Sequence, residues 1–469
     1  MKTLAFFKGL SWLLLLNLLI KPVWIFLIDR QVQNIAGNEA YGRYFAVLSL
    51  SYVLFFLADA GLSNMLNQRV AQRSAVHLRQ LLKMKFFLLG IYAVVCFFIG
   101  WLTHIQQWNL LIYVMLIQAL TSLFSFLRSI VTAYQYFTTD AWLSVVDKLL
   151  MTLICGSLIY GSLAAKMNLI LFLQIQLFCT GAAVMLTAFF LMRKKVFQLM
   201  PEEPVDRIIA LILPFALIIL LMSMHYRLDG FLLERIHFNG PVEAGIYASA
   251  YRLLDAANMI GYLADSFLVP FIARNYKDKA VLSTTILFTR HGLLFCAIGL
   301  VCFVAVYAPW LQKLLYHNSM PYQTRVLQLC MAALPGYFMV HIYGSVLTAT
   351  KRFRSFISIL LISVVINLVL NLFLIAQYGA LGCCIAAVCS QYFCGIACCL
   401  MVRRELQVPF GLPSVAVYLS AAALLTGLFY WGRMTVSNVW IILAISVCFI
   451  SILLAAQFRN FKKYFIAIR

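Results

Sequence analysis

The chain has 469 residues, of which 64% are hydrophobic and 11% charged, and its net charge is +21. A soluble domain is about half apolar and about a quarter charged. Composition therefore excludes a disordered chain, a secreted disulfide scaffold and a cytosolic Rossmann-type enzyme. The positive charge follows from basic loops retained at one membrane face, so we expect no nucleic-acid partner.

Fourteen stretches are apolar enough to cross the bilayer as helices, which takes about 20 residues each. They are centred on residues 11–28, 44–66, 86–103, 109–131, 142–163, 169–192, 208–226, 245–271, 287–309, 327–348, 355–375, 379–401, 413–432 and 437–456. The first continues through Lys21 and Pro22 without a small-residue cleavage site, which favours a span over a signal peptide. The sequence predicts an all-α polytopic membrane protein.

Lysine and arginine are distributed unevenly between alternate loops. The N-terminus, the even-numbered loops and the C-terminus carry 23 of these residues, and the odd-numbered loops carry 7. Basic loops remain in the cytoplasm, so both termini are predicted to be cytoplasmic. The connections, including the one near 193–207, are too short for a soluble domain. We therefore expect the protein to act within or across the membrane.

The chain repeats itself at an offset that drifts from 200 to 216 residues. The matched positions, in order, are Asp29 with Asp229, Glu39 with Glu243, Asp59 with Asp265, and Ser129 with Ser345. Six spans in each copy give both halves the same orientation, with a cavity between them. We predict two six-helix lobes in parallel pseudo-repeat, residues 1–195 and 196–405. Two further helices and a cytoplasmic tail would occupy residues 406–469.

Charged residues inside the predicted spans are costly, at about 2.5–3.5 kcal/mol each at the bilayer centre. The cations among them are Lys21, Arg128, Lys148, Arg227, Arg252 and Arg290. Proline accompanies two of them, because Pro22 follows Lys21 and Pro214 lies in the span that ends at Arg227. Interrupted helices in both halves indicate a transport site with hinges at these two prolines. Ordinary packing kinks are the alternative.

Several of these charges also have structural interpretations. Arg128 and Arg290 lie near span ends, where long side chains can reach the membrane interface. Arg252 and Asp255 are three residues apart and can pair on one helix face, joined by Arg227. Two further intramembrane acids, Asp59 and Asp265, are either coupling-ion sites or structural helix contacts. Cations still outnumber acids, which suits an anionic substrate such as phosphate.

The sequence contains no cysteine motif or phosphate-binding loop that would indicate a metal site or ATP hydrolysis. The thirteen cysteines show no pairing at metal-ligand spacing, so we expect neither a metal nor disulfides. The chain also has no glycine-rich loop followed by Lys-Ser or Lys-Thr, which argues against ATP hydrolysis. We expect no cofactor.

Three segments resemble bacterial polysaccharide flippases of the Wzx type. They are Glu39-Ala40-Tyr41-Gly42 through the Leu57-Ala58-Asp59-Ala60-Gly61-Leu62 run, Gly245-Ile246-Tyr247-Ala248 with Tyr251-Arg252-Leu253, and Lys351-Arg352-Phe353 through Asn367 and Asn371 to Tyr378-Gly379-Ala380-Leu381-Gly382. The resemblance covers nearly the whole chain and is one of pattern. Cys383 and Cys384 stand where such proteins usually have alanine, a conservative departure. The same superfamily contains lipid II flippases and multidrug antiporters, which share the two-lobe fold.

The resemblance implies a flippase that moves undecaprenyl-pyrophosphate-linked oligosaccharide across the bacterial cytoplasmic membrane by alternating access. It would serve O-antigen, capsule or exopolysaccharide synthesis, with membrane lipids and the polymerase and glycosyltransferases of the pathway as partners. Related flippases hold the pyrophosphate with basic residues in a central cavity. The positional equivalents here are Lys21, Arg128, Arg227 and Arg252. On this reading the protein is not an enzyme.

Three other functions are weighed against this interpretation. A drug or cation antiporter of the same fold would need acids to dominate the cavity. A membrane glycosyltransferase or polymerase usually carries a long external catalytic loop, and no loop here is long enough. A structural subunit without transport is disfavoured by the duplication and the interrupted helices.

Overall fold

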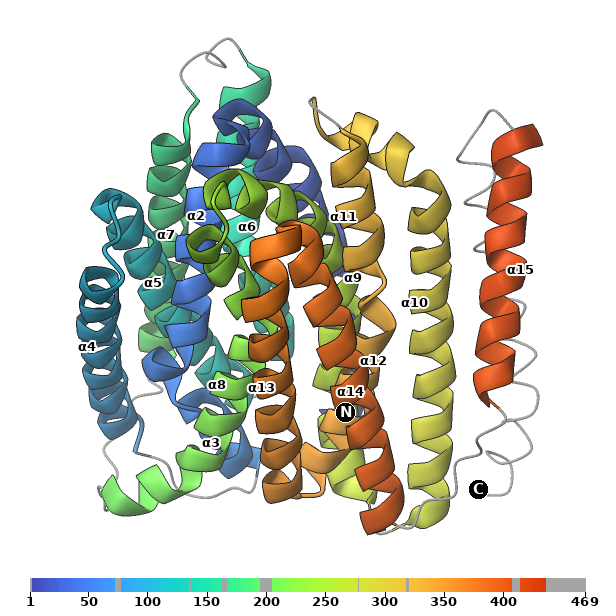
Figure 1. The fold of residues 1–469 in the computed structure, drawn as a ribbon. Helices are drawn as coiled ribbons and strands as arrows, with labels where there is room; N and C mark the ends of the chain where they lie inside the picture. Colours follow the sequence, from blue (N-terminus) through green and yellow to red (C-terminus); the bar gives the residue numbers. More distant parts are fainter. Residues whose placement is uncertain are drawn as a thin grey trace. The chain divides into compact units, whose positions relative to one another are not determined.

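A computed structural model describes residues 2–71, 77–134, 136–161, 167–194, 205–276, 278–317, 320–406 and 414–435. This part of the chain contains helices and no strands (Figure 1), which confirms the predicted all-helical class. Twelve helical runs within it are long and apolar enough to cross a membrane. The last predicted span, 437–456, lies outside the described residues, so the total of fourteen stays a prediction.

The contacts between Cα atoms divide the chain into two units, Met1–Gly245 and Ile246–Arg469. Unit 1 contains α1 (Lys2–Val23), η1 (Trp24–Asp29), α2 (Arg30–Asp59), α3 (Leu62–Ala71), α4 (Leu78–Leu102), α5 (Trp108–Ala133), α6 (Phe137–Tyr160), α7 (Leu169–Arg193), α8 (Val205–Ile236) and the start of α9 (Gly240–Asn275). Unit 2 contains the rest of α9, α10 (Lys279–Leu315), α11 (Pro321–Met331), α12 (Leu334–Ala349), α13 (Phe353–Tyr378), α14 (Ala380–Leu406) and α15 (Ser414–Thr435). The lobe boundaries at 195 and 405, which rest on the sequence repeat, stay predictions.

The first two predicted spans form one helical run, Leu15–Asp59, of 45 residues. A straight helix of that length would measure about 68 Å, more than twice the hydrocarbon core. The run is interrupted instead. Pro22 lies at the end of α1, and the next six residues form the π-helix η1. Within α2, Gly37 leaves the helical conformation with φ +78°, which separates two membrane-length segments.

In unit 1, α2 is the central helix and packs against α4, α5 and α8. Its closest approach is to the start of α9. A Cβ atom on Gly42 would lie 1.8 Å from the carbonyl oxygen of Pro241, and one on Gly245 would lie 2.0 Å from the carbonyl oxygen of Asn38. The two backbones can touch only because both positions are glycine.

We expect Gly42→Ala to destabilise the protein by at least about 1–3 kcal/mol, because the added methyl group must push two backbones apart. Gly90 of α4 supplies the matched control, since a Cβ there meets no atom within 4 Å. Gly90→Ala should be neutral or stabilising by about 0.5–1 kcal/mol, as for glycine inside any helix. Thermal unfolding of both purified variants tests this, and equal midpoints would refute the close approach.

Unit 2 is built around α12 and α14, which pack against each other and each against α13. Between α13 and α14, Asn367 donates to the hydroxyl of Ser390 at 3.3 Å and Asn371 donates to Asn367 at 3.0 Å, all buried. Such side-chain bonds hold helices together where lipid gives no hydrophobic drive.

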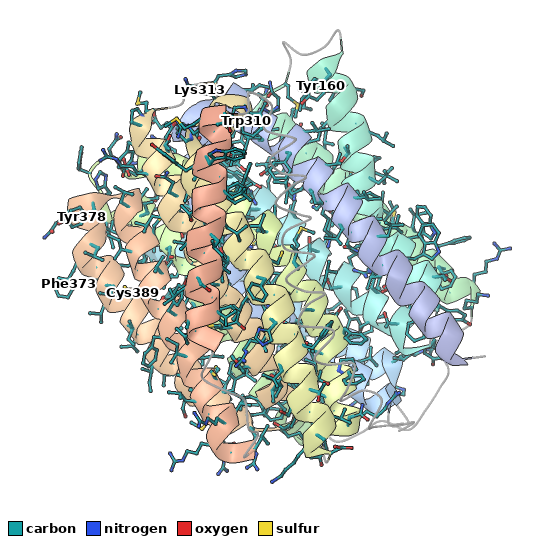
Figure 2. The ribbon with its side chains drawn as sticks, turned by 90° about the vertical axis from the view of Figure 1, so that its right-hand side faces the viewer. Tyr160, Trp310, Lys313, Phe373, Tyr378 and Cys389 are labelled. Atoms are coloured by element: carbon teal, nitrogen blue, oxygen red, sulfur yellow. The ribbon has the colours of Figure 1, made fainter. Side chains whose placement is uncertain are left out.

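The outer face of unit 2 suits contact with lipid. Phe373 of α13 is 70% exposed, and in Figure 2 it lies on the same side as Tyr378 and Cys389. Trp310 and Lys313 lie together near the end of α10 in the same view. Aromatic and basic residues at a helix end are typical of a membrane–water interface.

Candidate functional site

Three helices of unit 1 bring together five charged residues, which we call the basic cluster. Lys21 lies at the end of α1 and has electrostatic interactions with Arg128, Asp147 and Lys148. Arg128 comes from α5, and Asp140, Asp147 and Lys148 come from α6. With three cations and two carboxylates, the cluster carries a net charge of +1.

Two of the three cations have carboxylate partners. The Arg128 guanidinium binds Asp140 through two bonds, Nε to Oδ1 at 2.8 Å and Nη2 to Oδ2 at 3.1 Å. Lys148 Nζ lies 3.3 Å from Asp147 Oδ2 and 4.5 Å from the centre of the Trp24 ring. Two-point binding fixes the Arg128 fork, whereas Lys148 is held more loosely by its sequence neighbour and a cation–π contact.

Lys21 is different. Within the described part of the chain, no carboxylate lies within ion-pair distance of its ammonium group, although the side chain is half-buried. A charge that has lost water without gaining a counter-ion is costly in the membrane. An anion bound at Lys21 would remove that cost.

The helix that carries Lys21 is fixed to α6. Asn17 of α1 donates to the Ser144 hydroxyl at 2.8 Å, and Leu16 packs against Ala141 and Val145. Beyond Pro22, the Tyr160 hydroxyl donates to the carbonyl oxygen of Leu27 at 2.9 Å. These contacts hold the helix on both sides of Pro22, so Lys21 lies at a defined position just before the π-helix.

The other two candidate cations lie elsewhere. Arg227 of α8 is in unit 1, with its guanidinium carbon 4.6 Å from the centre of the Tyr52 ring. Arg252 is buried on α9 in unit 2, and Asp255 is half-buried one turn later on the same helix. Of the four cations named from the sequence, the structure therefore brings Lys21 and Arg128 together within one unit.

Asp59 of α2 forms a buried ion pair with a residue that the sequence pattern missed. Lys85 Nζ lies 2.6 Å from Asp59 Oδ1 and 2.7 Å from the Ser122 hydroxyl, and the Lys85 side chain is fully buried. The prediction that placed Lys85 in a loop before the span 86–103 was wrong. Helix α4 begins at Leu78, so Lys85 lies inside it.

Asp265 of α9 has another kind of partner. Its Oδ2 lies 2.5 Å from Nδ1 of His341 on α12, and its Oδ1 accepts from the Ser345 hydroxyl at 2.5 Å. The second ring nitrogen of His341 faces Asn258 Oδ1 at 3.0 Å. His341 lies in a predicted span, but a count of lysine, arginine and acids passes over it. Including histidine in that count would have found it.

Arg290 has its partners inside unit 2. It is buried on α10, where it interacts with the hydroxyl groups of Tyr343 and Tyr418. The interpretation as a side chain extended to the interface did not include these partners, which are tyrosines on α12 and α15. A single helix sequence does not show partners that come from other helices.

An open cleft of about 940 Å³ lies in unit 1 among α2 and the first turns of α5 and α7. None of the described residues that line it is charged. Amide side chains and one indole form its polar part, and this amide cleft is lined by Gln106, Gln107, Trp108, Asn109, Asn168 and Gln174. Amides hydrogen-bond to hydroxyl groups and an indole ring packs on apolar faces, a combination that suits a neutral polar ligand.

Several solved structures share this fold. The inward closed conformation of the lipid II flippase MurJ matches with a TM-score of 0.66 at 12% identity, covering 100% of this chain and 99% of that one. An outward-facing multidrug resistance MATE family transporter of the MOP superfamily gives 0.59 at 13% identity, with 85% and 96% covered. A MOP superfamily transporter from Pyrococcus furiosus gives 0.57 at 14% identity, again covering 85% and 96%. Identities this low show a common fold alone.

The sequence comparison gives the family. No curated protein sequence matches the chain. A family model described as "Polysaccharide biosynthesis protein" matches residues 6–276, which is more than half of the 469 residues. The predicted resemblance to polysaccharide flippases is thereby confirmed at the family level, and the chain belongs to the polysaccharide biosynthesis protein family.

Proposed function

We propose that this protein is a flippase for polyprenyl-pyrophosphate-linked oligosaccharide, with the pyrophosphate held at the basic cluster. The observation that carries the proposal is Lys21, a half-buried cation without a carboxylate partner in the described residues, close to Arg128 and Lys148. A pyrophosphate supplies the negative charge and the acceptor oxygens that these donors lack.

The three cations would have different roles. Lys21 binds the anion directly. Lys148, which is held at 3.3 Å by its neighbouring carboxylate, turns toward the anion as a second donor. Arg128 keeps Asp140 and contributes its remaining N–H groups. Bending at Pro22 and η1 would let the end of α1, which carries Lys21, move relative to α2 as access alternates.

The amide cleft supports the saccharide part of the substrate. It is lined by loops that the distribution of basic residues assigns to the periplasmic side. A site with five carboxamides, one indole and no charge can bind sugar hydroxyls without attracting the pyrophosphate. Unit 1 therefore offers the basic cluster for the pyrophosphate and the amide cleft for the saccharide of a lipid-linked oligosaccharide.

A drug or cation antiporter of the same fold is the second candidate. Its cavity would need uncompensated acids to bind a cation. In the described part of unit 1, the acids of the basic cluster are already bound by Arg128 and Lys148. The arrangement favours an anionic substrate, and we assign the protein no enzymatic activity.

Complementation tests the function. The protein is expressed in a strain that lacks its own O-antigen or capsule flippase but carries the matching sugar-assembly genes. Restored surface polysaccharide supports the proposal. A failure to restore it at normal protein levels, together with drug resistance on overexpression, would favour the antiporter instead.

Orientation in the membrane is tested by labelling with a membrane-impermeant maleimide. We expect Gln106→Cys, in the amide cleft, to react in intact spheroplasts, because its loop is predicted to be periplasmic. Lys194→Cys, at the end of α7, should react only after the membrane is opened. The parent protein with its native cysteines gives the background. The reverse pattern would contradict cytoplasmic termini.

A further inference from the structure

His341 and Asp265 form a buried pair in unit 2 in which both partners can gain or lose a proton. The ring nitrogen and the carboxylate oxygen lie 2.5 Å apart. The His341 side chain is fully buried, whereas the Asp265 side chain is 28% exposed. A proton can therefore reach the carboxylate from one side, while the imidazole is enclosed by the protein.

The hydrogen bonds around His341 can be completed in two protonation states. A neutral imidazole that donates from Nδ1 to Asp265 needs a donor at Nε2, which the NH₂ of Asn258 can provide. A protonated imidazole donates from both nitrogens, to Asp265 and to the oxygen of Asn258. Nε2 lies 3.0 Å from the Asn258 amide, which can present either its oxygen or its NH₂ to the ring. A turn of one amide converts either network into the other.

The corresponding acid in unit 1 has a different partner. Asp59 and Asp265 occupy matched positions of the sequence repeat, 206 residues apart. Asp59 is bound by Lys85 at 2.6 Å, with Ser63 and Ser122 completing the network. Asp265 has His341 in place of lysine. The unperturbed pKa of a histidine side chain is about four units below that of a lysine. The two halves share the acid but differ in its partner, a lysine in unit 1 and a histidine in unit 2.

The surroundings of the pair include other charged and titratable groups. α9 itself carries Arg252 and Asp255 in the turns before Asn258. On α10, which packs against α12, Arg290 interacts with Tyr343, and His291 bonds to the Tyr418 hydroxyl at 2.9 Å. The other helices packed on α12 present uncharged polar side chains in their buried positions, among them Asn367, Asn371, Ser390 and Gln391.

The pair joins a helix with an internal proline to the second half of an interrupted helical run. α9 contains Pro270 five residues after Asp265, and α12 begins only after a break that follows α11 and contains Pro335 near its start. The contact between the helices is close, because a Cβ on Gly261 would lie 2.4 Å from the His341 ring. Tyr262 meets the same ring edge-on at 4.8 Å between centroids. A change of charge at His341 therefore directly alters the packing of α9 on α12.

We propose that Asp265 and His341 form a reversible proton-binding site whose occupancy sets the packing of α9 against α12 and so couples transport to proton movement. Coupling rests on the proposed flippase function, whereas proton binding does not. In the protonated pair, the imidazolium and carboxylate hold α9 on α12. Loss of the proton leaves a net negative charge that weakens this contact.

Proton binding is measured first, on the full-length protein with ¹⁵N-labelled histidine in lipid nanodiscs. The His341 signals, assigned by their loss in His341→Gln, are recorded from about pH 5 to about pH 9 and should report both protonation states of the pair. Asp265→Asn should shift that transition, while His291→Gln should leave it unchanged. A ring that stays in one form throughout this range, or a transition that Asp265→Asn does not move, would overturn the proposal.

Coupling is measured with the same proteins in liposomes, using a fluorescent polyprenyl-pyrophosphate-linked N-acetylglucosamine as the probe. One coupled proton allows a pH gradient of one unit to change the distribution of the probe by up to about tenfold. We expect Asp265→Asn and His341→Gln to flip the probe but to lose this response, and His291→Gln to retain it.

The outcomes separate the two proposals. If the normal protein does not flip the probe at all while His341 titrates, the flippase proposal fails for this substrate and the proton site stands. If it flips the probe with no effect of pH, or follows a sodium gradient instead, the flippase stands and proton coupling is overturned.

Discussion

Replacing Lys21 by alanine is expected to lower the transport of lipid-linked oligosaccharide by about tenfold to a hundredfold. A charged hydrogen bond to phosphate contributes about 1.5–3 kcal/mol, and each 1.4 kcal/mol corresponds to a factor of ten. Because Lys21 has no carboxylate partner among the described residues, its removal leaves no acid unpaired. The protein should therefore fold and accumulate normally while surface polysaccharide falls.

Two further variants make this result specific. Lys21→Arg keeps the charge and should retain part of the activity. Lys313→Ala removes a lysine that is exposed near the end of α10, and it should have no effect. Full activity of Lys21→Ala would mean that Lys21 does not bind the substrate. The flippase proposal would then rest on the family match alone.

Lys85→Met should cause a large loss of stability, about 3–5 kcal/mol in the free energy of unfolding. The substitution leaves the Asp59 carboxylate nearly buried and without its counter-ion, which costs far more than an ion pair itself contributes. Methionine occupies a similar volume, so little of the loss comes from an empty cavity. The thermal unfolding midpoint of the purified protein in detergent measures the effect.

The double variant Lys85→Met with Asp59→Asn separates charge from packing. Removing both charges should recover much of the lost stability, since no uncompensated ion remains. Arg43→Ala is the matched control because the Arg43–Glu39 pair is exposed, and such pairs contribute about 0–1 kcal/mol. A Lys85→Met protein as stable as the Arg43→Ala protein would mean that Asp59 and Lys85 do not form a buried pair.

Long apolar runs made the helical class predictable, because lipid permits no other way to satisfy so many backbone groups in these stretches. Pro22 marked the place where α1 passes into the π-helix, and Lys21 stood out as a charge beside it, whereas the break at Gly37 was not predicted. The boundary of α4 was less predictable. Its first two turns, from Leu78, are polar enough to look like a loop, which hid the burial of Lys85.

The interaction partners of the charged residues were harder to predict than their positions in the helices. Asp140 binds Arg128 from the next helix, and Tyr343 and Tyr418 bury Arg290 from two others. The periodicity of one helix says which residues share a face, but it does not say which neighbouring helix meets that face. The matched acids Asp59 and Asp265 show the same limit, since the repeat predicts a common position but their partners, Lys85 and His341, differ.

Direct flipping in liposomes tests the central claim, that a lysine at the end of α1 without a carboxylate partner among the described residues holds a transported pyrophosphate. The purified protein is reconstituted with fluorescent polyprenyl-pyrophosphate-linked N-acetylglucosamine, and the fraction of probe reached by a membrane-impermeant quencher is followed over time. We predict flipping by the normal protein and by Lys313→Ala, and at least tenfold slower flipping by Lys21→Ala. Equal rates for Lys21→Ala and the normal protein would contradict the claim.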